Sequence, residues 1–394
     1  MRIGLFTTDF PYKKPFVDEV PEGGAYVRSG VGEVVYHLAL ELEKLGHEIG
    51  IFTTSADRSD HTEEFGGITV FRYGKDLKLA ETEISLKYLR GRDTPPLDIV
   101  HLHAGSPPAT LAALGHIRQN RAPFVVTHHL DPDIWSGNLV RRVLLYGYSE
   151  YYLRQSFAKS DRIIALSQEV VASSPHLQPF RNRISVIPNG IDIAELETPL
   201  SKKECRRRLG LPEGGAIVLF LGNLVPRKGP HVLLASMQTV FREAPDTTLV
   251  LAGTITPFGA GLREEAKALS LEKNVVFTGT VGEETKKLLY HAADIFALPS
   301  FGEAYPLTVL EAAACGLPAV VSGLPVFRAQ VCDGENGLFS KTGDPEDLGA
   351  KILRLVRARE EREKMGRNAR SAVQGLDWAR IAAAHEAVYR EVSR

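Results

Sequence analysis

Two carboxylates in one short segment, Glu303 and Glu311, are the residues of this sequence whose type and spacing best fit chemistry. They stand eight residues apart in PSFGEAYPLTVLEAAACGLP, residues 299–318. The residues before this segment are apolar and predict a buried strand. Glu303 is then expected in the loop after the strand, and Glu311 over one turn into the helix that follows. The alternative is an acidic loop before an ordinary amphipathic helix.

The ends of the predicted helix carry recognisable signals. Pro306 fits the first helical position, where its missing N–H costs nothing. The amides of Leu307 and Thr308 then lie unpaired at the positive end of the helix dipole, which suits a phosphate. Gly316 and the proline two residues later predict the helix end. A loop carboxylate, an anion site and a second carboxylate match the parts of a nucleotide-sugar.

A second segment, GNLVPRKG at residues 222–229, follows another predicted strand. It places Arg227 and Lys228 where the chain leaves the carboxyl edge of a sheet, so either cation could neutralise phosphate charge. The alternative is a solvated loop. A third segment, SGVG, has Gly30 just before the first long predicted helix, where glycine lets a diphosphate approach the backbone. Neither GxGxxG nor GxxxxGK[ST] occurs in the sequence.

Histidines close two predicted strands. His101 and His103 end one, and His128 and His129 end another, where strand alternation puts the latter two on opposite faces. Asp131 and Asp133 follow. Because no HExxH or comparable ligand spacing occurs, we expect hydrogen-bonded strand-end histidines and no metal site.

Short apolar strands alternate with amphipathic helices almost throughout, which predicts parallel sheets covered by helices on both faces. We expect an α/β protein with two doubly wound domains, residues 1–195 and 196–375, facing a central cleft. A linker is expected over residues 188–209, and a final helix at 376–394 that crosses back to the first domain. The predicted strands are 2–6, 48–53, 99–103, 124–127, 162–166, 184–187, 217–221, 248–252, 275–278, 295–298 and 319–322.

Composition narrows the class of protein. The 394 residues have 44% hydrophobic and 24% charged content, which is typical of a soluble globular protein, and a net charge of −1, which gives no global field to attract nucleic acid or anionic lipid. Cys205, Cys315 and Cys332 form no CxxC pair, which favours a reduced, cytoplasmic compartment. No apolar run reaches the ~18 residues of a membrane span.

These motifs together resemble those of retaining glycosyltransferases of family 4, which have the GT-B fold of two Rossmann-like domains. The resemblance covers nearly the whole chain. Its strongest part is the element from Glu303 to Glu311, which is similar to the family's E-x7-E. The supporting parts are HLALELEKLGHEI, IPNGID, ADIFALPS, EAAACGLPAVVSGLP and GDPEDL.

The resemblance implies roles for individual residues. Glu303 is expected beside the donor sugar, and Glu311 on the ribose hydroxyls. Lys228 resembles the phosphate-binding lysine, and Gly30 the loop glycine beside the donor diphosphate. His129, rather than His128, is expected to contact the transferred sugar or the acceptor.

Three residues depart from the family pattern. Asn223 replaces an arginine, so Arg227 is the candidate replacement for one diphosphate cation. Ser29 replaces one of a pair of glycines, and Pro306 replaces the glycine before the helix. The amides of Leu307 and Thr308 are still expected to bind the diphosphate.

The expected activity is metal-independent transfer of a hexosyl group, with retention, from a UDP-, GDP- or ADP-sugar to a hydroxyl acceptor. The acceptor is a sugar, a small phosphorylated metabolite or a lipid-linked molecule, and no cofactor is expected. Two alternatives stay open: an isomerase similar to nucleotide-sugar 2-epimerases, and a non-catalytic sugar-nucleotide binder. The oligomeric state is left open.

The acceptor side is expected to include Tyr12, Lys13 and His103, since the long segment at residues 9–31 suits a cover over an acceptor pocket. Residues 139–159 combine four tyrosines with arginines and a lysine, which suits peripheral contact with an anionic membrane. We favour the alternative that this helix is core on one face and solvated on the other.

Overall fold

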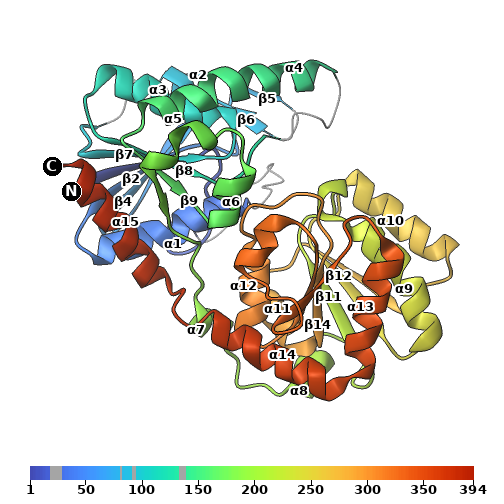
Figure 1. The fold of residues 1–394 in the computed structure, drawn as a ribbon. Helices are drawn as coiled ribbons and strands as arrows, with labels where there is room; N and C mark the ends of the chain where they lie inside the picture. The colour runs from blue at the N-terminus through green and yellow to red at the C-terminus, as the bar shows by residue number, and fades with distance from the viewer. Residues whose placement is uncertain (18–28, 80–81, 91–94, 133–138) are drawn as a thin grey trace. The chain divides into compact units, whose positions relative to one another are not determined.

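The computed structural model describes residues 1–17, 29–79, 82–90, 95–132 and 139–394, which fold as two units (Figure 1). Unit 1 comprises Met1–Gly190 and Trp378–Arg394, and unit 2 comprises Ile191–Asp377. The divisions therefore fall at 190/191 and 377/378, and not at 195/196 and 375/376 as expected from the sequence.

Unit 1 is built on an eight-stranded sheet with the order β10-β9-β8-β7-β1-β2-β4-β3. Its strands are parallel except β3, which pairs antiparallel with β4. A separate antiparallel pair is formed by β5 and β6. The strands are β1 (Arg2–Phe6), β2 (Glu48–Thr54), β3 (His61–Phe65), β4 (Ile68–Tyr73), β5 (Leu77–Leu79), β6 (Thr82–Ile84), β7 (Ile99–Ala104), β8 (Phe124–His128), β9 (Arg162–Ala165) and β10 (Ile184–Val186).

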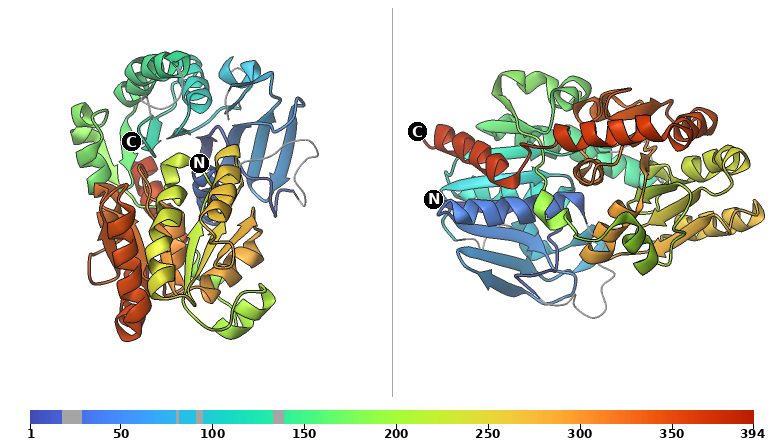
Figure 2. Two further views of the ribbon diagram at one scale, coloured as in Figure 1. Left: turned by 90° about the vertical axis from the view of Figure 1, so that its right-hand side faces the viewer. Right: turned by 90° about the horizontal axis from the view of Figure 1, so that it is seen from below.

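Helices cover both faces of this sheet. Figure 1 shows α1 and α15 against one face and α2, α3 and α5 against the other. Because α15 belongs to unit 1, the two chain ends lie near each other in this unit (Figure 2). The helices are α1 (Gly30–Lys44), α2 (Leu86–Arg90), α3 (Pro107–Gln119), α4 (Leu139–Gly147), the π-helix η1 (Tyr148–Leu153), α5 (Arg154–Lys159), α6 (Gln168–Ser173), the 3₁₀ helix η2 (Gln178–Arg183) and α15 (Trp378–Val392).

Unit 2 has a six-stranded parallel sheet with the order β13-β12-β11-β14-β15-β16. Its strands are β11 (Ile217–Leu221), β12 (Thr248–Ala252), β13 (Val275–Gly279), β14 (Ile295–Leu298), β15 (Ala319–Ser322) and β16 (Gly337–Ser340). Its helices are α7 (Ile193–Leu196), α8 (Lys202–Arg208), η3 (Pro226–Lys228), α9 (Pro230–Glu243), α10 (Pro257–Ala268), α11 (Glu283–Ala292), α12 (Leu307–Ala314), η4 (Pro325–Ala329), α13 (Pro345–Arg357) and α14 (Arg359–Ala372).

The strand order determines where each unit can hold a ligand. In unit 2 the chain proceeds from β11 to β12 and β13 on one side, and then to β14 on the other side of β11. In unit 1 the same reversal occurs between β1 and β7. The carboxyl ends of the two strands at such a reversal diverge into loops that leave a crevice, which is where doubly wound sheets bind ligands.

The linker expected over residues 188–209 is wrong in its basic part, which forms α8 (Lys202–Arg208). Residues of α8 belong to unit 2, and both Cys205 and Arg206 in this helix are buried. The reason is Asp294, which directly precedes β14 and is a buried carboxylate. A charge in that position needs a buried partner, and α8 supplies it.

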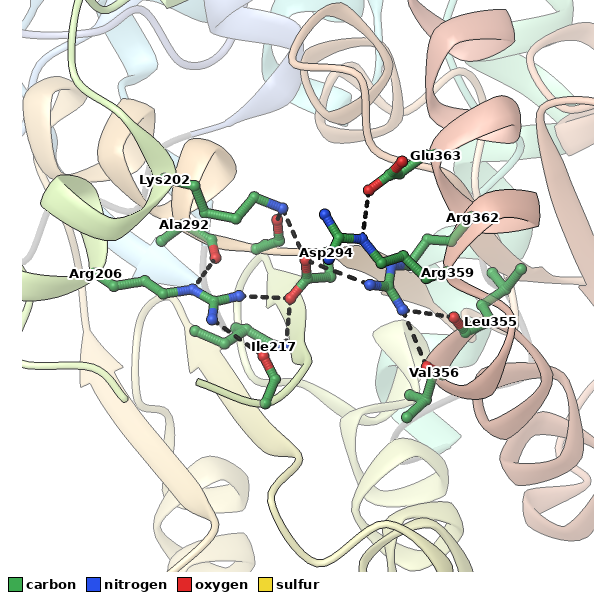
Figure 3. A network of polar contacts seen from close by, with 12 residues as sticks. Lys202, Arg206, Ile217, Ala292, Asp294, Leu355, Val356, Arg359, Arg362 and Glu363 are labelled. Carbon is green, nitrogen blue, oxygen red and sulfur yellow. Dashed lines mark hydrogen bonds and ion pairs between the residues drawn. The ribbon is translucent and has the colours of Figure 1, made fainter. Parts of the chain in front are cut away.

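Figure 3 shows Asp294 at the centre of this network. Its carboxylate is 2.5 Å from a guanidinium nitrogen of Arg206 and 2.7 Å from the ammonium of Lys202. It also accepts the backbone N–H of Ile217 in β11 at 2.8 Å. A third cation, Arg362 of α14, lies at 4.0 Å. Although burial raises the pKa of Asp294, Lys202, the Ile217 amide and Arg206 lower it by more, so the carboxylate stays charged.

Candidate donor site in unit 2 and histidine cluster in unit 1

Glu303 lies in the loop after β14, at the reversal of strand order, and is only 8% exposed. Its Oε1 is 2.6 Å from the Lys228 ammonium, and its Oε2 is 3.7 Å from the Arg227 guanidinium. The Ser300 hydroxyl donates to Oε1 at 2.8 Å. The structure therefore brings together three of the residues singled out from the sequence, and adds Ser300.

Close contact between two loops produces this arrangement. Gly229 has a φ of +69°, and a Cβ there would lie 2.0 Å from the Pro299 carbonyl oxygen. Only glycine fits such an approach without a shift of the backbone. The Phe301 N–H donates to the Arg227 carbonyl at 2.7 Å, and the Arg227 guanidinium donates to the Gly302 carbonyl. The loops after β11 and β14 thus hold each other, with the cations on the carboxylate.

Glu311 in α12 is held at both carboxylate oxygens by α11. The Lys286 ammonium donates to Oε1 at 2.8 Å, and the Tyr290 hydroxyl donates to Oε2 at 2.6 Å. Burial, and then the charge of Glu311, raise the pKa of Tyr290 well above its usual value. Burial lowers the pKa of Lys286, but Glu311 and Glu283 raise it by more, so the ammonium stays charged.

Sequence reasoning missed Lys286 and Tyr290. The sequence did contain a signal. Lys286 and Tyr290 are four residues apart, so they share one face of a helix, and each side chain ends in a polar group. What the sequence did not show is that this face of α11 meets Glu311 of α12.

The start of α12 differs by one residue from the expectation. Pro306 is the N-cap, with φ −67° and an extended ψ of 122°, and the helix begins at Leu307. Leu307 and Thr308 are thus its first two residues, whose N–H groups have no acceptor within the helix. The helix ends as predicted, with Gly316 at φ +74°. The amide pair keeps its expected place at the positive end of the dipole.

In unit 1, His129 directly follows β8 and contacts His103 of β7. The Nε2 of His129 lies 3.0 Å from Nδ1 of His103. Both residues are buried, so His103 offers little surface to an acceptor. Burial, and then His128 and His385, lower the pKa of His129 to about 3. The His129 ring is therefore neutral at pH 7.

The neighbouring histidines are held inside the fold of unit 1. His101 contacts the Tyr389 hydroxyl of α15 and the Thr127 hydroxyl of β8, each at 2.7 Å. Burial lowers the pKa of His101, and that of His103, well below the usual value. The buried rings therefore join α15 to the sheet as neutral groups.

His128 points away from these rings into different packing. Its Nε2 lies 3.1 Å from the Asp131 carboxylate, and its ring meets that of Phe157 edge-on. Asp133 is outside the described residues. Among the residues that the structure describes, no group of three or more His, Cys, Asp or Glu is arranged to hold a metal ion.

The remaining residues of unit 1 that we expected at the site are Gly30, Tyr12 and Lys13. Gly30 is the first residue of α1, and a Cβ there would meet nothing within 4 Å. Tyr12 is nearly buried, and its ring lies 3.6 Å from the Arg72 guanidinium. Lys13 pairs with Glu33 at 2.6 Å. Tyr12 and Lys13 are thus engaged within unit 1, and residues 18–28 of the segment proposed over the acceptor pocket lie outside the described residues.

Two family models match this chain. The model described as Glycosyltransferase Family 4 matches residues 28–195, and the model described as Glycosyl transferases group 1 matches residues 201–372.

No helix among the described residues has the length and apolar character to cross a bilayer.

Two relatives align over most of the chain. An alpha-monoglucosyldiacylglycerol synthase of Streptococcus pneumoniae is 30% identical over 90% of this chain and 78% of its own length. A D-inositol 3-phosphate glycosyltransferase of Nocardia farcinica is 30% identical over 90% of this chain and 82% of its own.

Solved structures share the fold at lower identity. A sucrose-phosphate synthase from Thermosynechococcus elongatus superposes with a TM-score of 0.78 at 22% identity, covering 99% of this chain and 98% of that one. Anabaena Alr3699/HepE, solved in complex with UDP-glucose, gives a TM-score of 0.72 at 18% identity over 99% of this chain and 100% of its own. With two Rossmann-like units in the GT-B class and family matches along both, the chain belongs to glycosyltransferase family 4 and is a glycosyltransferase.

Proposed function

We propose that this glycosyltransferase moves a hexosyl group from a nucleoside diphosphate sugar to a hydroxyl acceptor, with retention and without a metal ion. The observation that carries the proposal is the pair of carboxylates around the start of α12, Glu303 buried and Glu311 13% exposed in its side chain, each matched to a cation. Glu303 pairs with Lys228, and Glu311 pairs with Lys286.

The diphosphate is proposed to lie between Lys228, Arg227 and the first amides of α12. Lys228 has three N–H donors, so it can keep Glu303 and still donate to a phosphate oxygen. Arg227 is 38% exposed in its side chain and can turn toward the same anion. In the reaction the bond between the sugar C1 and the β-phosphate oxygen breaks. Charge then grows on the leaving diphosphate, which these fixed donors stabilise.

The acceptor oxygen forms the new bond to C1, and its proton is proposed to pass to the leaving phosphate. Neither carboxylate then needs to form a covalent intermediate. Glu311 is proposed to accept the ribose hydroxyls on the oxygens that Lys286 and Tyr290 orient. For His129 we propose a neutral ring that positions a hydroxyl, because a group with a pKa of about 3 is a weak base at pH 7.

The names of the relatives support a hydroxyl acceptor that is either lipid or small and phosphorylated. One relative makes a glucosyldiacylglycerol, and another acts on D-inositol 3-phosphate. We propose the same range of acceptors for this chain, with a sugar as the third class.

The test is a hydrolysis screen of UDP-, GDP- and ADP-sugars, followed by an acceptor screen with the donor that turns over. Proton NMR of the product should show the anomeric configuration of the donor. Turnover should persist in EDTA. Inversion would refute retention, and loss of turnover in EDTA restored by Mn²⁺ would refute the metal-free anion site. A C2 epimer as product would identify an isomerase instead.

A further inference from the structure

Asp9 is a carboxylate of unit 1 whose side chain has no partner within the part of the chain that the structure describes. It lies three residues beyond the end of β1, at the edge of the sheet where the strand order reverses between β1 and β7. Its side chain is half-buried, and no described residue donates a hydrogen bond or forms an ion pair with its carboxylate. A carboxylate that loses water normally gains a donor from the protein. Both oxygens of Asp9 are therefore open to a donor from a ligand.

The backbone on both sides of Asp9 is held in place. Before it, the Thr53 hydroxyl of β2 donates to the Thr8 carbonyl at 2.9 Å. After it, the buried guanidinium of Arg72 in β4 donates to the Phe10 carbonyl at 2.9 Å. A side chain on a backbone that is already fixed loses little further freedom when it binds a ligand.

The charged groups around Asp9 do not neutralise it. Burial, and then the negative charge of Glu83 in β6, raise the pKa of Asp9 from 3.8 to about 6. The Lys75 ammonium pairs with Glu83 at 3.2 Å, and the Tyr88 hydroxyl of α2 donates to two backbone carbonyls. Because the folded state raises this pKa, ionisation of Asp9 opposes folding, and the cost is complete above about pH 6. At pH 7 the fold therefore carries a charge that does not stabilise it.

Asp57 offers a direct comparison in the same sheet. It lies three residues beyond β2, the parallel neighbour of β1, and is half-buried like Asp9. Its carboxylate, however, accepts the Ser55 hydroxyl at 3.0 Å and the Ser59 amide at 2.8 Å. The hydrogen bond from the Ser59 hydroxyl is the largest cause that lowers the pKa of Asp57. Of these two matched positions, one carboxylate is used by the fold and the other is not.

The chemistry of the position indicates what Asp9 can bind. An ionised carboxylate accepts hydrogen bonds from O–H and N–H groups, and the charges of Asp9 and Glu83 repel a phosphate. His129, for which we propose contact with a hydroxyl, follows β8 at the same edge of the sheet, two strands from β1. A ligand with several hydroxyl groups therefore fits this edge.

We propose that Asp9 binds the acceptor by accepting a hydrogen bond from a hydroxyl group of its sugar, inositol or glycerol part, and that any phosphate of the acceptor lies away from Asp9. The proton stays on the acceptor hydroxyl, so Asp9 determines binding and specificity and forms no covalent bond. The inference rests on the proposed function, because it presupposes transfer to a hydroxyl acceptor.

The test compares Asp9→Asn with the wild type in two reactions of the same donor. Transfer is measured with glucose, an inositol phosphate and diacylglycerol in detergent micelles, and hydrolysis is measured without an acceptor. The variant should raise the acceptor KM by roughly ten- to a hundredfold, because it replaces a charged acceptor of a hydrogen bond by a neutral one. Donor hydrolysis should stay near the wild-type rate. The melting temperature at pH 7 should be equal or higher, since the carboxylate has no donor to lose.

The pH profile gives a second readout. In the wild type, kcat/KM for the acceptor should fall below about pH 6, because protonation removes the charge that the hydroxyl meets. Asp9→Asn should lack this fall, and Glu83→Gln should move it to lower pH by removing the neighbouring charge. His129 does not titrate in this range, since its pKa is about 3. The profile of donor hydrolysis supplies the background.

Asp57→Asn is the matched control, and it should lower the melting temperature while leaving the acceptor KM near the wild-type value. An unchanged acceptor KM in Asp9→Asn would overturn the proposal. So would a lower melting temperature with equal losses of hydrolysis and transfer, which would mean a structural role. If the wild type hydrolyses a donor but transfers to none of the acceptors, the role of Asp9 is refuted and the donor site stands. If it hydrolyses no donor, the proposed function itself is refuted.

Discussion

β14 of unit 2 has a buried carboxylate near each end, and the two are neutralised in different ways. Before the strand, Asp294 meets Arg206 and Lys202. After it, Glu303 meets Lys228 and, at longer range, Arg227. The first group joins α8 to the sheet, whereas the second lies where the strand order reverses.

The two carboxylates differ in how the N–H groups of their cationic partners are used. Arg206 is buried and donates to the carbonyls of Ala292, Glu213 and Gly215 as well as to Asp294. Its hydrogen-bonding capacity is thus used within the fold. Lys202 beside Asp294 is 46% exposed in its side chain and Arg227 beside Glu303 is 38% exposed, so the contrast rests on the saturated hydrogen bonds of Arg206 and not on the exposure of the cations. Removing a partner of Asp294 therefore leaves a buried charge uncompensated, whereas the Lys228 ammonium, with three N–H donors, keeps donors for a ligand while it contacts Glu303.

The largest effect is expected for Asp294→Ala. It leaves Arg206 buried without its carboxylate, so the free energy of unfolding should fall by about 3–5 kcal/mol. Urea denaturation measures the loss, and turnover per folded molecule should stay near the wild-type value. A loss below ~1 kcal/mol would contradict a structural role for this carboxylate.

Next in size is Lys228→Ala, which removes the closest cation from the site that we propose for the diphosphate. Turnover should fall about 10²–10³-fold. The unfolding free energy should fall less than in Asp294→Ala, because Arg227 and Ser300 still contact Glu303. The matched control, Arg206→Ala, should show the reverse: a large loss of stability with turnover retained. Equal patterns in the two variants would remove the distinction between the two ends of β14.

Glu311→Ala should weaken donor binding by roughly ten- to a hundredfold, since a charged acceptor for the ribose hydroxyls is worth about 1.5–3 kcal/mol. Calorimetry with the nucleoside diphosphate measures it. Glu283→Ala is the control, because Glu283 also pairs with Lys286, at 2.7 Å, but is more exposed. Unchanged affinity in Glu311→Ala would refute the ribose assignment.

The smallest effect is expected for Tyr290→Phe. The change removes one neutral donor from Glu311, while Lys286 still holds the other oxygen. Donor affinity should fall by about fivefold, or ~1 kcal/mol. Tyr389→Phe removes a comparable buried hydroxyl from His101 in unit 1 and should leave donor affinity unchanged. Equal loss in both variants would mean that the effect on Glu311 is not specific.

Local sequence determined much of unit 2. The bounds of β11, β12, β14 and β15 agree with those predicted, because each is an apolar run between turn residues. Gly316 ends α12 as expected, since its positive φ favours glycine. The loop position of Glu303 follows from the same strand and helix signals. The strands β3, β4, β5, β6 and β16 were missed.

Only the tertiary structure decided which distant residues became partners. Arg206 and Asp294 are separated by 88 positions, and their contact exists because α8 packs against α11, the helix that leads into β14. Lys286 and Tyr290 became partners of Glu311 because α11, which leads into β14, lies beside α12, which follows β14. We expected residues 139–159 to be core on one face, yet no residue of α4 is buried, whereas η1 buries Tyr148, Ser149 and Leu153. A sequence displays periodicity and end signals over a few residues, whereas a buried charge selects its partner from whichever elements the sheet order brings within hydrogen-bonding distance.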